Sequence, residues 1–269
     1  KVEERGTFID GKLHGVCQIF YDNGQLLYGG TLKFGLQEGL QEEFYENGQL
    51  FSKTHFVGGK QVNGVEENFH ENGELMKRVN WKNGLKDGLY ETYHDNGKLH
   101  EKGTFIQNYF DGKSEEYDES GKLKRVLFHK EKSGEFLGIY DFKEFNENGE
   151  LVTKGSMNRF RKTGVWEFYE NERLKEKRTH LEEKGNNVHR AYVSETFYTN
   201  GNLKEKGKLN NYGREGTWEE YRTNGTIKEK RDYQYGEVYE SHYYNEVGDL
   251  TRTYYWIDGE IQKTKHYNN

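Results

Sequence analysis

The chain has no proline in its 269 residues, and it has a single cysteine, Cys17, and a single alanine, Ala191. Such a chain, which carries 33 glycines, is not a helix bundle, because alanine has the highest helix propensity and glycine one of the lowest. One cysteine excludes an internal disulfide framework and a zinc site built from cysteines. No run approaches the roughly 18 apolar residues of a membrane-spanning helix.

The sequence also lacks a large excess of charge of either sign. The 46 acidic and 40 basic residues alternate along the chain and leave a net charge of -6. A protein that tracks a phosphate backbone needs a basic stripe, and this sequence contains none. We therefore expect no nucleic-acid partner.

Internal repeats dominate what is present. The segments YDNGQL, YENGQL, HENGEL and HDNGKL begin at Tyr21, Tyr45, His70 and His94, 24 or 25 residues apart. The same column continues further along the chain and gives about ten units of 23–29 residues. Each unit has an aromatic residue four positions before its turn position and an aliphatic residue two positions after it. The aromatic column reads Phe20, Phe44, Phe69, Tyr93, Tyr117, Phe145, Phe168, Phe197, Tyr221 and Tyr244.

The turn within each unit predicts a β-hairpin. Asp22-Asn23-Gly24 fits a three-residue loop made of a type I turn and a glycine at positive φ. That loop makes Phe20 face Leu26 across an antiparallel pair. The same register, continued along the strands, predicts that Glu219 faces Glu229.

Two positions qualify this turn pattern. A second recurrent glycine, such as Gly15, is expected where one hairpin reverses into the next. Glu172 stands at one turn position, and we expect it to avoid the left-handed conformation, which is costly for a residue with a side chain.

The repeats predict an all-β fold. We expect an elongated single antiparallel β-meander of about ten hairpin repeats, which forms one continuous domain over residues 1–269. Longer, irregular units lie near 128–140 and 181–193. The tyrosine-rich stretch 233–269 is expected to act as a C-terminal cap, because a ribbon of strands exposes unpaired edges at both ends.

The repeat pattern resembles a known family. The pattern G-x-x-x-x-aromatic-x-x-N-G-x-L, followed by a polar x-N-G-x-x-x-G turn, is similar to the MORN-repeat variant of bacterial proteins, over about residues 6–259. Chains of this pattern are commonly grouped with YwqK-like antitoxins. The resemblance implies a protein-binding repeat scaffold, antitoxin-like or immunity-like, whose partner is a toxin or another polypeptide. Some MORN proteins are associated with lipids, but a net charge of -6 argues against an anionic bilayer.

No pattern of residues in the sequence predicts a catalytic or metal-binding site. Cys17 occupies a variable strand position with no base beside it, so we expect no reactive thiol. His70 and His94 occupy equivalent positions about 9.6 Å apart, too far to share one metal ion. We therefore expect no catalytic residue, no metal and no cofactor, and hence no enzyme.

Two surfaces are candidates for partner binding. Glu42, Glu67, Glu91 and Glu115 form an acidic column beside the aromatic column, which is either a groove for a basic polypeptide or a row that solvates one face of the sheet. Tyr45, His70 and His94 form a polar and aromatic column that we expect on the opposite face. Both columns are candidate sites for a polypeptide partner.

A second function stays open beside the antitoxin-like one. The chain begins at Lys1 rather than Met, so we expect either a location in the bacterial cytoplasm or export behind a signal peptide. An exported protein would bind a host protein or a glycan through exposed aromatic residues.

Overall fold

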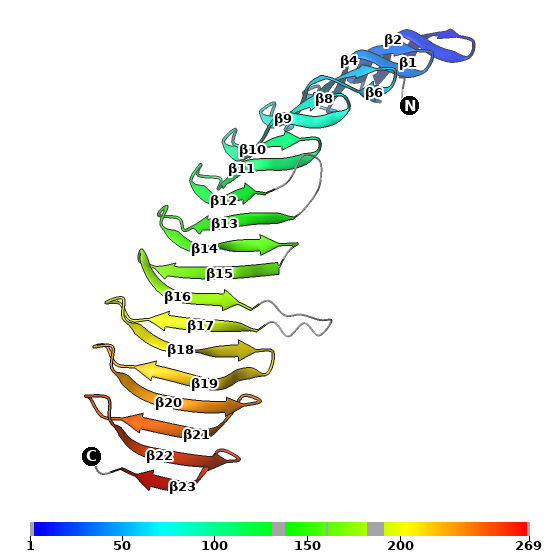
Figure 1. Ribbon diagram of the computed structural model, residues 1–269. Helices are drawn as coiled ribbons and strands as arrows, with labels where there is room; N and C mark the ends of the chain where they lie inside the picture. Colours follow the sequence, from blue (N-terminus) through cyan, green and yellow to red (C-terminus); the bar gives the residue numbers. More distant parts are fainter. Residues whose placement is uncertain (1–2, 131–137, 160, 182–190, 268–269) are drawn as a thin grey trace. The chain divides into compact units, whose positions relative to one another are not determined.

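The computed structural model describes residues 3–130, 138–159, 161–181 and 191–267, and the prediction of an all-β fold is confirmed (Figure 1). These residues form 23 strands and no helix, so none of them belongs to a helix that could span a membrane. The strands are β1 (Glu3–Ile9), β2 (Lys12–Phe20), β3 (Leu26–Lys33), β4 (Leu36–Phe44), β5 (Leu50–Val57), β6 (Lys60–Gln61), β7 (Gly64–Phe69), β8 (Leu75–Lys82), β9 (Leu85–Tyr93), β10 (Leu99–Ile106), β11 (Tyr109–Tyr117), β12 (Leu123–His129), β13 (Ile139–Phe145), β14 (Leu151–Asn158), β15 (Arg161–Glu170), β16 (Arg173–His180), β17 (Tyr192–Phe197), β18 (Leu203–Asn210), β19 (Gly213–Tyr221), β20 (Ile227–Gln234), β21 (Glu237–Tyr244), β22 (Leu250–Ile257) and β23 (Glu260–His266).

The chain divides into two compact units, residues 1–140 and 141–269. Within each unit neighbouring strands pair antiparallel, as β2 and β3 do in the first unit and β19 and β20 in the second, and both the short β6 and β7 pair with β5. The division falls at the irregular stretch 128–140, of which 131–137 lie outside the described residues, as 182–190 of the other irregular stretch also do. One continuous domain and an elongated shape stay predictions.

The asparagine-glycine turns have the predicted geometry. The Gly24 amide donates to the Tyr21 carbonyl at 2.9 Å, and the Tyr21 amide donates to the Gln25 carbonyl at 2.8 Å. These two bonds close a three-residue loop. The glycine has a φ between 77° and 89° in eight units, at Gly24, Gly48, Gly73, Gly97, Gly121, Gly149, Gly201 and Gly225.

A β-bulge follows seven of these turns, those at Gly24, Gly48, Gly73, Gly97, Gly121, Gly201 and Gly225, and corrects the predicted register. Phe20 faces Leu26 as predicted, but Ile19 faces Tyr28, so Leu27 is the extra residue. A bulge places two residues of one strand opposite one of the other, and it moves every later pair by one position. Glu219 consequently faces Lys230, and the prediction that it faces Glu229 is wrong.

The connections between hairpins differ from the prediction. The chain reverses at two-residue loops such as Asp10–Gly11, where both residues have positive φ, as a type I′ turn requires. Gly15, which was predicted at the reversal, lies inside β2.

The unit at 172 also has a two-residue loop. Asn171 and Glu172 have φ of 51° and 61°, so the prediction that Glu172 avoids the left-handed region is wrong. The loop is one residue shorter than in the other units. This deletion makes Tyr169, in place of Phe168, the partner of Leu174.

A row of buried side chains runs along one face of the strands. In the first unit this row includes Cys17 and Gln41, and in the second unit Trp166, Trp218 and Ser241, all of them buried. The indole of Trp218 lies against Gly207 and donates from Nε1 to the Lys208 carbonyl at 3.0 Å. Because side chains alternate between the two faces of a strand, the residues next to this row lie on the opposite face, where the candidate site residues are found.

Candidate binding surfaces

A ladder of alternating charges crosses the first unit on the face opposite the core. Its members pair from strand to strand in the order Glu42, Lys53, Glu67, Arg78, Glu91, Lys102 and Glu115. Lys53 Nζ lies 2.7 Å from Glu67 Oε2, and Arg78 contacts the other Glu67 oxygen at 2.9 Å. The bulge after the turn sets the register in which Glu42 faces Lys53, Glu67 faces Arg78 and Glu91 faces Lys102.

The pKa values reflect this pairing. Burial alone would raise the pKa of Glu67, but hydrogen bonds from Lys53 and Arg78 outweigh burial and lower this pKa. At Glu115 burial also acts upward, yet hydrogen bonds from two lysines and Tyr117 lower the pKa to about 2. Glu91 contacts Arg78 at 3.7 Å, whereas Glu42 has no ion pair within the described part of the chain. Three of the four predicted acids are therefore engaged by cations of their own chain.

The second predicted column joins neighbouring repeats. The Tyr45 hydroxyl donates to the Phe69 carbonyl at 2.9 Å. His70 Nε2 lies 3.0 Å from the Tyr93 carbonyl and His94 Nε2 3.1 Å from the Tyr117 carbonyl, so each imidazole nitrogen donates to the repeat that follows. These half-buried side chains hold successive hairpins together, and their role in partner binding stays a prediction.

The turn asparagines add a parallel row of bonds. Asn47 Nδ2 donates to the Glu71 carbonyl at 3.1 Å, and Asn72 Nδ2 donates to the Asp95 carbonyl at 2.6 Å. In each turn the Oδ1 of the same asparagine also accepts a backbone N–H two residues later, as Asn72 Oδ1 does from Glu74. Each asparagine therefore shapes its own loop and binds the next one.

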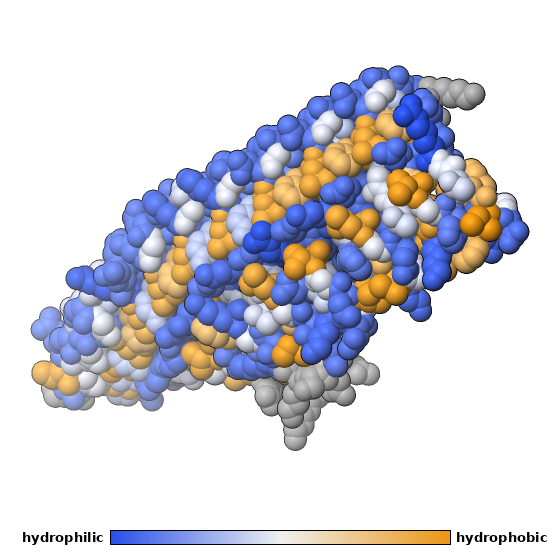
Figure 2. Space-filling view, turned by 90° about the horizontal axis from the view of Figure 1, so that it is seen from above, coloured by the Kyte–Doolittle hydropathy of each residue, from blue (hydrophilic) through white to orange (hydrophobic). Residues whose placement is uncertain are grey.

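An exposed aliphatic stripe runs beside the charge ladder in the first unit. Val16, Leu40, Val65 and Leu89 occupy equivalent positions in β2, β4, β7 and β9 and are 41–68 % exposed. They lie two residues before the acidic column, on the same face of the strands. With two strand spacings per repeat, the stripe is about 29 Å long. Figure 2 shows apolar rows beside charged rows on the face in view.

The sequence carries a signal for this stripe. Each of its residues directly follows one of the recurrent glycines, as Val16 follows Gly15 and Leu40 follows Gly39. The next unit has Lys113 at this position, which ends the stripe. A contiguous row of exposed aliphatic side chains is typical of an interaction site.

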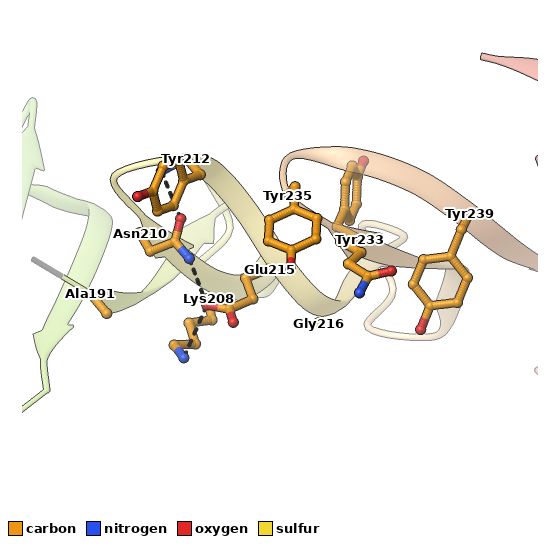
Figure 3. Close-up of a pocket in the computed structure, with 10 residues that line it drawn as sticks. Ala191, Lys208, Asn210, Tyr212, Glu215, Gly216, Tyr233, Tyr235 and Tyr239 are labelled. Carbon is orange, nitrogen blue, oxygen red and sulfur yellow. Dashed lines mark hydrogen bonds and ion pairs between the residues drawn. The ribbon is translucent and has the colours of Figure 1, made fainter. Parts of the chain in front are cut away.

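The second unit has an open pocket of about 760 Å³. Three tyrosines that are 49–81 % exposed, Tyr212, Tyr235 and Tyr239, stand around it (Figure 3). Polar groups line another part, where Glu215 accepts from Asn210 Nδ2 at 2.7 Å and lies 3.1 Å from Lys208 Nζ. The pocket therefore offers flat aromatic rings next to hydrogen-bonding groups.

A family model described as the MORN repeat variant matches the chain seven times, at residues 13–31, 37–57, 62–83, 86–107, 110–131, 193–211 and 214–235. These segments cover more than half of the chain. The chain belongs to the MORN repeat variant family. The repeats support a binding role for the MORN scaffold.

Comparisons with whole proteins add little to this assignment. No curated protein matches the chain. The crystal structure of TcdB2-TccC3-Cdc42 is similar at 10 % identity and a TM-score of 0.24, over 93 % of this chain and 15 % of that chain. A structure of TcdB2-TccC3 without its hypervariable C-terminal region has 10 % identity and a TM-score of 0.23, over 97 % of this chain and 16 % of that chain. The MORN chain thus spans about one sixth of the length of these chains.

The single cysteine of this MORN protein has a structural environment. Cys17 is 2 % exposed, and burial, with a smaller contribution from Glu4, raises the pKa of its thiol. A buried thiol with a raised pKa is a poor nucleophile. Cys17 thus belongs to the packed row of the core.

Proposed function

We propose that this MORN repeat protein is a non-catalytic scaffold that binds a polypeptide through the aliphatic stripe of its first unit. The observation that carries the proposal is the repetition of Val16, Leu40, Val65 and Leu89 as exposed residues at one position of four consecutive repeats. Exposed aliphatic side chains in a row are unfavourable in water, and burial against a partner would remove that cost.

The dimensions and charges of this face favour a polypeptide. About 29 Å of stripe matches roughly nine residues of extended chain at ~3.3 Å per residue. The adjacent ladder is largely neutralised within the protein, so the partner is selected by apolar side chains more than by net positive charge. A toxin polypeptide with an extended apolar segment would be such a partner, and the protein would then have an antitoxin-like or immunity-like role.

Two observations support the non-catalytic part of the proposal. The thiol of Cys17 is buried beneath the binding face. The repeated histidines His70 and His94 each bond to a backbone carbonyl of the following repeat. The thiol is therefore shielded from solvent, and the two imidazole nitrogens make structural hydrogen bonds.

Affinity purification with paired variants tests the proposal. The wild type, the double variant Leu40→Asp and Leu89→Asp, and the control Val247→Asp would each be used to capture polypeptides from an extract of the native organism. Val247 is an 80 % exposed residue in a turn of the second unit and serves as a matched apolar-to-acid change. We expect the same polypeptide to be enriched by the wild type and the control and lost with the double variant. Equal enrichment by all three proteins would contradict the proposal.

The tyrosine pocket of the second unit favours an alternative function, binding of a glycan by an exported protein. Aromatic faces next to carboxylate and amide groups, as Tyr235 lies near Glu215 and Asn210, suit the apolar faces and hydroxyls of a sugar. A glycan array would test it with Tyr235→Ala as the variant and Tyr255→Ala, outside the pocket, as the control. Binding of a defined glycan that only Tyr235→Ala abolishes would support this alternative, and no binding by the wild type would overturn it.

A further inference from the structure

Two carboxylates face each other near the end of the second unit. Asp232 on β20 is the cross-strand partner of Glu240 on β21, and both are half-buried. Like charges directly opposite each other are destabilising. Elsewhere on this face of the unit Glu195 is paired with Lys177 and Glu219 with Lys206. The Asp232–Glu240 pair differs from these ion pairs.

The group beside these two acids is an imidazole. His242 Nε2 lies 3.7 Å from Asp232 Oδ2 and 3.8 Å from Glu240 Oε1. His242 therefore contacts both acids, and an imidazole can serve either as a cation or as a metal ligand. One nitrogen and two carboxylate oxygens thus converge, with all three donor atoms within 4.8 Å of one another.

Two neighbouring threonines orient these donors. His242 Nδ1 lies 3.0 Å from the hydroxyl of Thr253, which is almost fully buried, and this contact leaves Nε2 directed at the acids. Thr217 Oγ1 donates to Asp232 Oδ1 at 2.5 Å, so the other oxygen, Oδ2, faces the histidine. Hydrogen bonds of this kind to the second atom of a ligand are typical of metal sites.

We propose that Asp232, Glu240 and His242 form a binding site for one divalent transition-metal ion such as Zn²⁺. Ligands about 2.1 Å from a tetrahedral ion lie about 3.4 Å apart, so the observed distances from Nε2 need to shorten by only a few tenths of an ångström. The ion would neutralise the facing acids. Three protein ligands leave a fourth position for water or for a donor atom of a partner. A nitrogen and two oxygens suit Zn²⁺ and its neighbours better than Ca²⁺, which takes six or more oxygens.

The sequence did not predict this site. Asp232, Glu240 and His242 belong to no metal-binding motif, and the acids lie eight residues apart on different strands. The bulge in the β20–β21 pair, between Asp232 and Tyr233, sets the register that brings Asp232 opposite Glu240. Only the register places these three side chains together.

Calorimetric titration of the whole chain with Zn²⁺ tests the proposal, with Co²⁺ absorption as a second readout of nitrogen and oxygen ligation. We expect one ion per chain and at least tenfold weaker binding in His242→Gln and in Asp232→Asn. We also expect a loss of about tenfold in Thr253→Val, which removes the hydroxyl that contacts His242 Nδ1 and Tyr267 but keeps all three metal ligands. The control is His266→Gln, an exposed histidine on β23.

A second measurement guards against variants that fold poorly. Zn²⁺ should raise the melting temperature of the wild type and of His266→Gln but not that of His242→Gln, because a ligand stabilises only a folded state that binds it. The proposal is overturned if the wild type binds no Zn²⁺ at millimolar concentration. It is also overturned if His242→Gln and Asp232→Asn bind as tightly as the wild type, or if His266→Gln loses binding to the same extent as His242→Gln.

Discussion

Replacement of Gly207 by alanine tests the packing of the buried row in the second unit. Gly207 lies under the indole of Trp218, and a Cβ added there would come within 2.2 Å of Trp218 Cδ2. Ordinary contact begins at 3.4 Å, so the ring would have to move by about 1.2 Å. The indole is held by its bond to the Lys208 carbonyl, and Arg214 covers the ring at 4.0 Å. The ring therefore cannot move without disturbing both neighbours.

The expected magnitude follows from two opposing effects. Overpacking of a well-packed core costs about 1–3 kcal/mol. Alanine in place of glycine reduces the entropy of the unfolded chain and returns about 0.4–1 kcal/mol. We expect Gly207→Ala to lower the free energy of unfolding by about 1–2 kcal/mol. Urea unfolding followed by tryptophan fluorescence would measure it.

Gly29→Ala is the matched control for this experiment. Gly29 also lies inside a strand, but a Cβ there would meet only Leu26 Cδ2, at 3.4 Å. This variant should be as stable as the wild type or slightly more stable. If Gly207→Ala unfolds at the same urea concentration as the wild type, or if both variants lose the same stability, the close approach of Trp218 does not require glycine.

Three further predictions concern the turns and the ion-paired Glu219 of the second unit. Glu172→Gly should raise the free energy of unfolding by about 1 kcal/mol, because glycine has no penalty at positive φ; an unchanged or lower value in urea would refute this. Asn72→Ala should cost about 1–2 kcal/mol by removing two turn bonds, and a thermal melt equal to that of the wild type would count against the inter-repeat role. Burial raises the pKa of Glu219, but hydrogen bonds from Lys230 and Lys206 outweigh burial and lower this pKa from its ordinary value of 4.5 to about 2. The ionised carboxylate therefore stabilises the fold fully above pH 4.5, and this stabilisation is lost as the pH falls toward 2. Glu219→Gln should accordingly be less stable than the wild type at pH 7, and this difference should shrink between pH 4.5 and 2; a difference that is constant with pH would exclude the ion pairs as its source.

Local rules in the sequence were sufficient to predict the hairpins. The Asp22-Asn23-Gly24 loop and the Phe20–Leu26 pair depend on residues within seven positions of one another, and the structure has both. The bulge at Leu27 was not predicted, because the repeats carry the same extra residue and the spacing between them therefore gives no sign of it. Every cross-strand contact beyond the bulge was therefore assigned to the wrong partner.

The candidate sites show the same limit. The alternation of side chains along a strand was sufficient to place Glu67 on the correct face. Its basic partners, Lys53 and Arg78, could not be predicted, because their positions opposite Glu67 depend on the register that the bulges set. The aliphatic stripe was readable in the sequence as the residue after each recurrent glycine. Val65 is exposed whereas Val79 in the adjacent strand is fully buried, because Val79 pairs with Glu66 and so lies on the opposite face from Val65.

Site-specific photo-crosslinking tests the binding role of the stripe most directly. Benzoylphenylalanine would replace Val65, at the centre of the stripe, or Val247, which is exposed on the second unit. The two proteins would be irradiated in an extract of the native organism, and the products compared by electrophoresis and mass spectrometry. The account predicts that a polypeptide is attached at position 65 and that position 247 gives no such product. Equal products at both positions, or a product at position 247 alone, would contradict it.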